Sequence, residues 1–253
     1  LTVPNVHGAI ARQAIANGKH VYNEKPLSTE WEDAKTLIAE AKAKGLYVGC
    51  APDTILGAGQ QTARAAIDSG RIGTVIGVHA AMMGFGPEPW HPSPDFFYKP
   101  GGGPMLDMGP YYVTAMVNLL GPIQRVAGLA KATFAERTIG SGDRAGEKIV
   151  VETPTYLEAL LDFEGGAFGR LTTSFDTAHS LMDWGHPIVV FGTDAVMKVP
   201  DPNTFGGEVL VKGKDAEDWT PLPVAHGFPE NSRGLGVRQI ALALQGKGEN
   251  LAS

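Results

Sequence analysis

The stretch HVYNEKPLS, residues 20–28, joins a strand-forming run to a proline and then to the start of a helix. Residues 20–22 favour an extended strand, and Pro26 removes a backbone donor and fixes its own φ angle. Because the residue before a proline is pushed out of the helical region, we expect Lys25 to be extended at the C-terminal end of this strand. In an open α/β sheet, that edge is where ligands bind. The alternative is an exposed Glu–Lys pair before a helix, which is common and energetically minor.

Helices and strands alternate on both sides of this stretch. A helix is expected upstream at residues 5–17, and a second helix is expected downstream with Ser28 or Thr29 as its cap. A further strand and helix follow. Repeated β–α units imply a parallel sheet with crossover helices. Residues 1–73 are therefore predicted to form the end of a doubly wound domain.

The pattern changes after residue 73. A helical segment is expected at residues 104–121, and the rest of this part is dominated by strand-like runs. These runs lie at residues 75–83, 125–138, 155–177, 187–199 and 208–213. Successive hairpins build an antiparallel or mixed sheet. The predicted fold class is thus α/β plus α+β, with residues 74–253 forming a domain on a large, mainly antiparallel sheet.

The composition limits the class of protein. The chain has 253 residues, 43% of them hydrophobic, and a net charge of −6 with acidic and basic residues interspersed, so no nucleic-acid partner is expected. No apolar run is long enough to span a bilayer, and no membrane contact is expected. Cys50 is the only cysteine, and no Cys/His cluster has metal-ligand spacing, so no metal site is predicted. A cytoplasmic location is expected because no export signal is visible.

Both ends of the chain lie inside the expected architecture. The sequence opens on a helix with no strand before it and stops soon after another helix. We therefore expect a piece of a longer protein, shortened at both ends.

The stretch GGGPMLDMGPYY, residues 101–112, combines three glycines with a carboxylate and two phenols. Asp107 and Tyr111 are four residues apart, so they share one face if the segment is helical. Such a pair is able to orient and deprotonate a substrate hydroxyl. The alternative is that Asp107 caps a helix or forms an ion pair and that Tyr111 and Tyr112 belong to the core.

Two other stretches are less specific. LGAGQQT, residues 56–62, partly matches a dinucleotide-binding loop, but its third glycine is missing and no acidic residue follows at the expected distance, so we interpret it as a glycine-rich helix start. WHPSPDFFYKP, residues 90–100, offers an aromatic wall that suits a sugar ring or a nicotinamide and equally suits a packed loop. Trp90, His91 and Tyr98 are the candidate substrate contacts in it.

Five stretches together resemble the Gfo/Idh/MocA family of glucose–fructose oxidoreductases, inositol dehydrogenases and rhizopine catabolism proteins. They are GKHVYNEKPLS (18–28), DSGRIGTVIGVHA (68–80), GGGPMLDMGPYY (101–112), LLDFEGGAFGRLTTSF (160–175) and IVVFGTDAVMKVPDP (188–202). The resemblance covers nearly the whole chain. It implies that residues 1–73 are the remnant of a Rossmann domain that binds NAD or NADP, and that residues 74–253 bind substrate and mediate homo-oligomerisation through the sheet.

The resemblance also implies roles for individual residues. Lys25 lies beside the nicotinamide, hydrogen-bonds the reacting oxygen and favours the deprotonated form of a neighbouring acid/base, while Glu24 and Pro26 line the cofactor side. Asp107 orients the substrate. Many members carry a histidine where this chain has Tyr111, and members similar to glucose–fructose oxidoreductase carry a tyrosine. Tyr111 is therefore the expected proton acceptor, with Tyr112 as a reserve and substrate contact.

The implied function is hydride transfer between a nicotinamide cofactor and a sugar, polyol or related secondary alcohol. Two alternatives remain open on the same fold. One is an NAD-dependent glycosidase, and the other is a non-catalytic regulator that senses a sugar or dinucleotide. The family's GxGxxG loop and the residue that selects NAD or NADP are expected to lie before residue 1.

Overall fold

The computed structural model describes residues 2–179, 186–224 and 226–248. Residues 2–51, which we call the N-terminal unit, form a two-stranded parallel sheet with Val21 paired to Val48. Alanine, isoleucine, valine and leucine side chains from the two helices and the first strand form its small core. Its elements are η1 (Pro4–Val6), α1 (His7–Ala16), β1 (Val21–Asn23), α2 (Trp31–Ala43) and β2 (Val48–Cys50).

The second part of the chain, which we call the sheet unit, is built on an eight-stranded sheet in the order β12-β11-β10-β9-β3-β8-β7-β4. Every neighbouring pair is antiparallel except β3 and β8, which run parallel. A separate hairpin joins β5 and β6. The strands are β3 (Val75–Met83), β4 (Ile123–Lys131), β5 (Glu136–Thr138), β6 (Lys148–Val150), β7 (Tyr156–Phe163), β8 (Phe168–Ser174), β9 (Ile188–Gly192), β10 (Ala195–Val199), β11 (Leu210–Gly213) and β12 (Thr220–Pro221).

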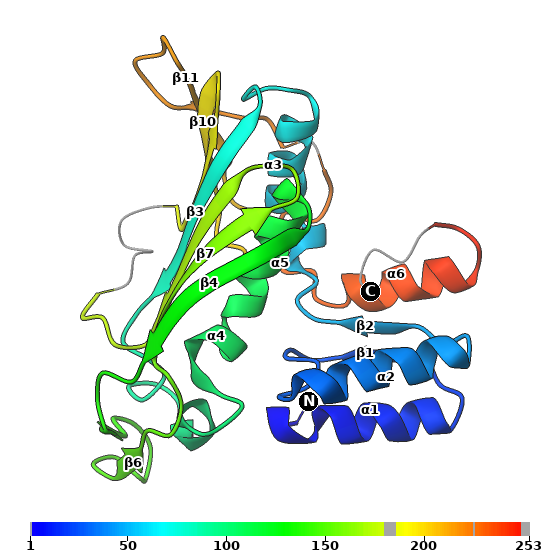
Figure 1. Ribbon diagram of the computed structural model, residues 1–253, viewed down its shortest axis with the longest axis vertical. Helices are drawn as coiled ribbons and strands as arrows, with labels where there is room; N and C mark the ends of the chain where they lie inside the picture. The colour runs from blue at the N-terminus through cyan, green and yellow to red at the C-terminus, as the bar shows by residue number, and fades with distance from the viewer. Residues whose placement is uncertain (1, 180–185, 225, 249–253) are drawn as a thin grey trace.

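Helices cover one face of the large sheet and leave the other face bare (Figure 1). The covering elements are α3 (Ala58–Asp68), α4 (Gly103–Asp107) and α5 (Gly109–Leu120). Two short 3₁₀ helices pack beside them, η2 (Thr54–Leu56) on α3 and α5 and η3 (Pro94–Tyr98) on α4 and β6. Apolar side chains of α3 and α5 join those of the central strands in the main core. The architecture is therefore a short Rossmann remnant followed by a domain with a large, mainly antiparallel sheet, and the expected fold class is confirmed.

The domain boundary after residue 73 stays a prediction. Ala63, Ala66 and Ile72 come before that boundary in the sequence, and their side chains lie in the core of the large sheet. The glycines of the LGAGQQT stretch have a packing role. A Cβ at Gly57 or Gly59 would lie 2.3 Å from a carbonyl oxygen of the loop at residues 205–206.

The last helix, α6 (Leu235–Leu244), returns to the N-terminal unit and packs against β2. Its first turn is held by Asp53, whose carboxylate accepts the backbone N–H groups of Gly234 at 2.8 Å and Gly236 at 3.2 Å. The two-stranded sheet thus lies between α1 and α2 on one side and α6 on the other (Figure 1).

The segment expected to be helical, residues 104–121, is mostly helical, but it divides at Met108, where Gly109 and Pro110 begin a second helix. One local prediction was wrong. The helix α2 takes Glu30 as its N-cap rather than Ser28 or Thr29. Ser28 instead accepts the Glu30 N–H and donates to Asp33. None of the helices in the described residues is long and apolar enough to cross a membrane.

Candidate active site

Lys25 follows the C-terminal end of β1 and reaches across to the sheet unit. Its ammonium donates to two oxygens of Asp107, the carboxylate Oδ1 and the backbone carbonyl oxygen, each at 2.6 Å. The side chains are only 16% and 24% exposed. Both hydrogen bonds are charge-assisted, and partial burial weakens the screening by water and salt. Two residues separated by 82 positions in the sequence therefore form one rigid pair.

The break between α4 and α5 places Asp107 for this contact. Asp107 is the last residue of α4, and Tyr111 lies in the first turn of α5. The expected common helical face is lost at the break, yet both side chains approach Lys25. The Lys25 ammonium lies 5.4 Å from the centre of the Tyr111 ring.

Two cations lie near the ring of Tyr111. The guanidinium of Arg233, just before α6, lies 6.0 Å from the same ring centre. Tyr111 is only 6% exposed and belongs to the main core. Part of the alternative interpretation is therefore also true, since Asp107 forms an ion pair and both tyrosines are core residues.

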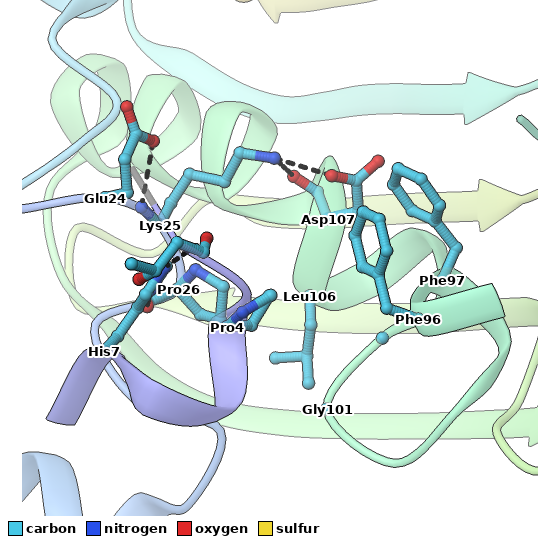
Figure 2. Close-up of a pocket in the computed structure, with 12 residues that line it drawn as sticks. Pro4, His7, Glu24, Lys25, Pro26, Phe96, Phe97, Gly101, Leu106 and Asp107 are labelled. Atoms are coloured by element: carbon cyan, nitrogen blue, oxygen red, sulfur yellow. Dashed lines mark hydrogen bonds and ion pairs between the residues drawn. The ribbon is translucent and has the colours of Figure 1, made fainter. Parts of the chain in front are cut away.

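A cavity of about 330 Å³ opens beside the Lys25–Asp107 pair. Figure 2 shows Lys25 extended across it toward Asp107, with the rings of Phe96 and Phe97 beside the carboxylate. Glu24, Lys25 and Pro26 contribute one wall, and Gly101, Gly102 and Leu106 contribute another. The cavity thus brings together two of the stretches that the sequence analysis singled out.

His7 is a residue of this cavity that the sequence analysis left unassigned. It is buried, and its Nδ1 lies 2.8 Å from the carbonyl oxygen of Pro26 while its Nε2 lies 3.2 Å from that of Thr2. It therefore fixes the turn that carries Lys25. Glu24 contributes to the same turn, since its carboxylate accepts the backbone N–H of Lys25 at 3.3 Å. Nineteen positions separate His7 from Pro26, and this spacing carries no signal of their contact.

Tyr98 and Tyr112 lie in the core and not in the cavity. Tyr98 is fully buried, and its hydroxyl donates to Glu88. Burial raises the pKa of Tyr98, and the Glu88 carboxylate adds to the shift. Burial also raises the pKa of Tyr112, with a smaller contribution from Asp201. Tyr111 does not line the cavity either, but its ring lies 5.4 Å from the Lys25 ammonium, so Tyr111 stays in the proposed site and Tyr98 and Tyr112 do not.

Trp90 and His91 lie outside the residues that line the cavity. Trp90 is exposed, whereas the His91 ring packs edge-on against Phe96 and Phe97, with ring centres 5.6 and 5.3 Å apart. His91 thus supports the aromatic wall from behind.

A buried charge network holds the loop that carries this wall. Arg137 of β5 donates to Glu88 and, at 2.9 Å, to Asp176, while Thr155 donates to the other oxygen of Asp176 at 2.7 Å. Buried charges of this kind are tolerated only when paired and hydrogen-bonded. The members of this network come from four distant segments, so no local pattern in the sequence indicates it.

The cavity suits the nicotinamide end of a dinucleotide. Pro26, Phe97 and Leu106 offer apolar walls for a planar ring, and Glu24 and Thr2 offer polar groups at its edge. Within residues 2–179, 186–224 and 226–248, no group of three or more His, Cys, Asp or Glu side chains is placed to hold a metal ion.

Comparison with known families matches both parts of the chain. Residues 1–51 match the oxidoreductase family with an NAD-binding Rossmann fold, and residues 60–198, more than half of the chain, match the GFO/IDH/MocA C-terminal domain.

Individual relatives agree with this assignment. The chain is 34% identical over 246 residues to a dTDP-3,4-didehydro-2,6-dideoxy-alpha-D-glucose 3-reductase of Streptomyces antibioticus, covering 95% of this chain and 66% of the relative. It is 28% identical over 232 residues to the trans-1,2-dihydrobenzene-1,2-diol dehydrogenase of Bos taurus, covering 91% and 62%. The chain therefore spans less than two thirds of the length of each of these curated relatives.

Solved structures show the same fold. An inositol dehydrogenase homologue from Azotobacter vinelandii, complexed with NADH and myo-inositol, is 25% identical with a TM-score of 0.69, covering 90% of this chain and 55% of that one. An NAD-binding oxidoreductase from Klebsiella pneumoniae superposes with a TM-score of 0.75 at 23% identity, covering 98% and 69%. Because the two family models match residues 1–51 and 60–198 and the solved structures share this fold, the chain belongs to the Gfo/Idh/MocA family of oxidoreductases.

Proposed function

We propose that the protein is an NAD- or NADP-dependent oxidoreductase that transfers hydride between the nicotinamide and a sugar, polyol or related secondary alcohol. The observation that carries this proposal is the Lys25–Asp107 pair at 2.6 Å beside a cavity that the Rossmann remnant and the sheet unit line together.

Lys25 is the proposed contact to the reacting oxygen. An ammonium has three N–H groups, and within the described residues Asp107 accepts from it through two oxygens. One N–H therefore remains for a substrate oxygen. The positive charge stabilises negative charge that develops on that oxygen as its proton leaves.

Tyr111 is the proposed proton acceptor, and Asp107 the residue that fixes Lys25. Tyr111 lies in the first turn of α5 next to the Lys25 ammonium. When bound, NAD or NADP supplies the hydride acceptor, held on the side of Glu24, Lys25 and Pro26. Water is kept from the reacting oxygen by Phe96 and Phe97, which line the cavity beside Asp107.

The names of the relatives support the substrate class. One relative is a 3-reductase of a deoxysugar nucleotide, one a dehydrogenase of a cyclic diol, and one solved homologue is complexed with myo-inositol. Each name refers to a ring that carries oxygen substituents. We propose a substrate of this kind here, and a homo-oligomer that forms through the bare face of the sheet.

The test uses the full-length gene product with its complete Rossmann domain. Nicotinamide absorbance is recorded before and after addition of a panel of sugars and polyols, for the wild type, for Lys25→Met and for the exposed control Lys19→Met. A substrate-dependent rise in reduced nicotinamide that Lys25→Met lowers by about 10³-fold, and Lys19→Met retains, is the expected result.

Other outcomes favour the alternatives. Full turnover by Lys25→Met would overturn the role of Lys25. Release of an aglycone without net change of cofactor would indicate the NAD-dependent glycosidase. A protein that binds cofactor and sugar but reduces nothing would indicate the regulator.

A further inference from the structure

A second cavity, of about 490 Å³, lies where the loop at residues 203–207 meets the segment at residues 229–233. Arg233 is the one basic residue among those that line it. The Lys25–Asp107 site makes no use of this cavity, and the sequence analysis did not single out any residue in it.

The guanidinium of Arg233 is held in a defined position. It lies 6.0 Å from the ring centre of Tyr111 and 5.9 Å from that of Phe205, so two aromatic rings contact it. It donates one hydrogen bond, at 3.2 Å, to the side-chain oxygen of Asn203. Because a guanidinium has several N–H groups in a planar fork, most of its donors remain for a ligand.

Arg233 also lacks the partner that most arginines of this chain have. Six other arginines form an ion pair with a carboxylate: Arg12, Arg64, Arg125, Arg137, Arg144 and Arg170. Within the described residues no carboxylate lies within 4.0 Å of Arg233, and this includes Glu230, the acidic residue that lines the same cavity.

The loop that orients Arg233 is packed tightly. The backbone N–H of Asn203 donates to Asp201 at 3.0 Å, and Thr204 donates to the Asp201 carbonyl oxygen at 2.8 Å. A Cβ at Gly206 would lie 2.1 Å from the carbonyl oxygen of Pro229. The two walls of the cavity therefore pack directly on each other, and Asn203 and Phe205 present fixed contacts to Arg233.

The ring of Tyr111 lies near both Arg233 and the Lys25 ammonium of the proposed reaction site. The Lys25 ammonium and the Arg233 guanidinium both lie within 6.0 Å of the centre of the same ring. The Lys25 ammonium and the Arg233 guanidinium are therefore no further apart than the sum of these two distances, a span that a sugar with one anionic substituent covers when it forms a hydrogen bond at each end.

We propose that Arg233 is a specificity-determining residue that binds an anionic group, a carboxylate or a phosphate, on the sugar or polyol substrate. The proposal deepens the proposed function and rests on it. Arginine suits this role because its planar fork matches the two oxygens of such a group. Asn203 and the two rings position the fork.

The test compares D-glucose, D-glucuronate and D-glucose 1-phosphate as substrates of the full-length protein, and the two anions distinguish a carboxylate from a phosphate. The variants are Arg233→Gln, Arg233→Lys and the control Arg238→Gln, an exposed arginine on α6 that lines neither cavity.

We expect at least one anion to have a lower KM than glucose. Arg233→Gln raises that KM by about 10- to 100-fold, leaves kcat within about 3-fold and leaves the KM of glucose unchanged. Arg233→Lys recovers part of the loss, and Arg238→Gln resembles the wild type.

Failure of this inference is distinguishable from failure of the proposed function. Turnover with the same preference for the anion in Arg233→Gln, or equal use of glucose and both anions, overturns the inference and keeps the oxidoreductase. If no sugar is oxidised, the same compounds are titrated by calorimetry. Anion binding that Arg233→Gln loses then supports the inference without the oxidoreductase, and no binding of either anion overturns it.

Discussion

Lys25 and Asp107 make both of their contacts through charge-assisted hydrogen bonds, and each contact depends on a different part of Asp107. The carboxylate contributes charge, whereas the backbone carbonyl contributes only position. Substitutions at Asp107 therefore separate the two contributions.

Asp107→Asn keeps the carbonyl contact and removes the charge. We expect kcat to fall by about 10²-fold while the circular dichroism spectrum stays that of the wild type, because the ammonium loses the group that fixes its orientation. The matched control is Asp95→Asn, which breaks an ion pair with Arg144 that is 2.7 Å long and more exposed. Equal kinetic losses in both variants would remove Asp107 from the site.

Tyr111 and Tyr112 offer an internal comparison, because each loses one hydroxyl in a Tyr→Phe change on the same helix. Tyr111→Phe is expected to lower kcat by about 10²- to 10⁴-fold. Tyr112→Phe is expected to retain it, since burial raises the pKa of Tyr112 and keeps its phenol protonated. Steady-state kinetics of the two variants decide the assignment, and the reverse order would make Tyr112 the proton acceptor.

At the level of residues, the sequence predicted what depends on a local pattern. Pro26 restricts Lys25, and this indicated its place at the end of a strand. The burial of Tyr98 was not predictable, because the loop around it is rich in aromatic residues and only the distant Glu88–Arg137 network decides which ring points inward. The role of His7 depends likewise on a contact to the carbonyl oxygen of Pro26.

In the sheet unit, the start of α3 packs closely against the loop at residues 205–207. Gly59→Ala would place a Cβ 2.3 Å from the carbonyl oxygen of Gly206. Because backbone has to move to relieve this overlap, we expect a loss of about 1–3 kcal/mol in the free energy of unfolding. Gly84→Ala is the control, since nothing lies within 4 Å of its added Cβ. Urea denaturation compares them, and equal midpoints would contradict the close approach.

Asp201 at the base of the same loop predicts a pH dependence. Burial raises its pKa above the value in the unfolded chain, opposed by the backbone N–H of Asn203. A carboxyl group whose pKa is raised on folding lowers the free energy of unfolding when it is ionised. This cost in stability is absent at pH below the unfolded pKa and complete at pH above the folded pKa.

Asp201→Asn removes this cost and keeps an oxygen for the Asn203 N–H. The variant is therefore expected to have a higher Tm than the wild type at pH 7, with the difference shrinking as the pH falls through the acidic range. Thermal denaturation at pH 3.5 and pH 7 measures it. A lower Tm at pH 7 would show that the charge of Asp201 stabilises the loop.

The sequence predicted most elements and few of their pairings. Apolar periodicity and glycine turns located the helices and the hairpin of β7 and β8. They did not indicate that β3 lies between β8 and β9, parallel to one and antiparallel to the other. That order depends on chain segments far apart in the sequence, for which local patterns carry no information.

The bare face of the large sheet gives a prediction for the whole molecule. Leu129, Leu160 and Phe168 lie on neighbouring strands and are 81%, 64% and 68% exposed. Exposed apolar side chains grouped in this way are typical of interaction surfaces. Phe168→Asp is expected to shift the full-length protein from an oligomer to a smaller species in light scattering. Ile38→Asp on α2 is the control, and an unchanged mass for Phe168→Asp would place the interface elsewhere.

The chain passes between the N-terminal unit and the sheet unit twice, once after β2 and once before α6. These two passages are bonded to each other, because Ala58 donates to the Phe228 carbonyl oxygen at 3.1 Å and Asp53 accepts from Gly234. We expect two bonded connections of this kind to act as a hinge that favours rotation of the two units about one axis. Rotation about that axis would change the gap that Lys25 spans to reach Asp107, so the opening of the cavity and the breaking of its ion pair are expected to occur together.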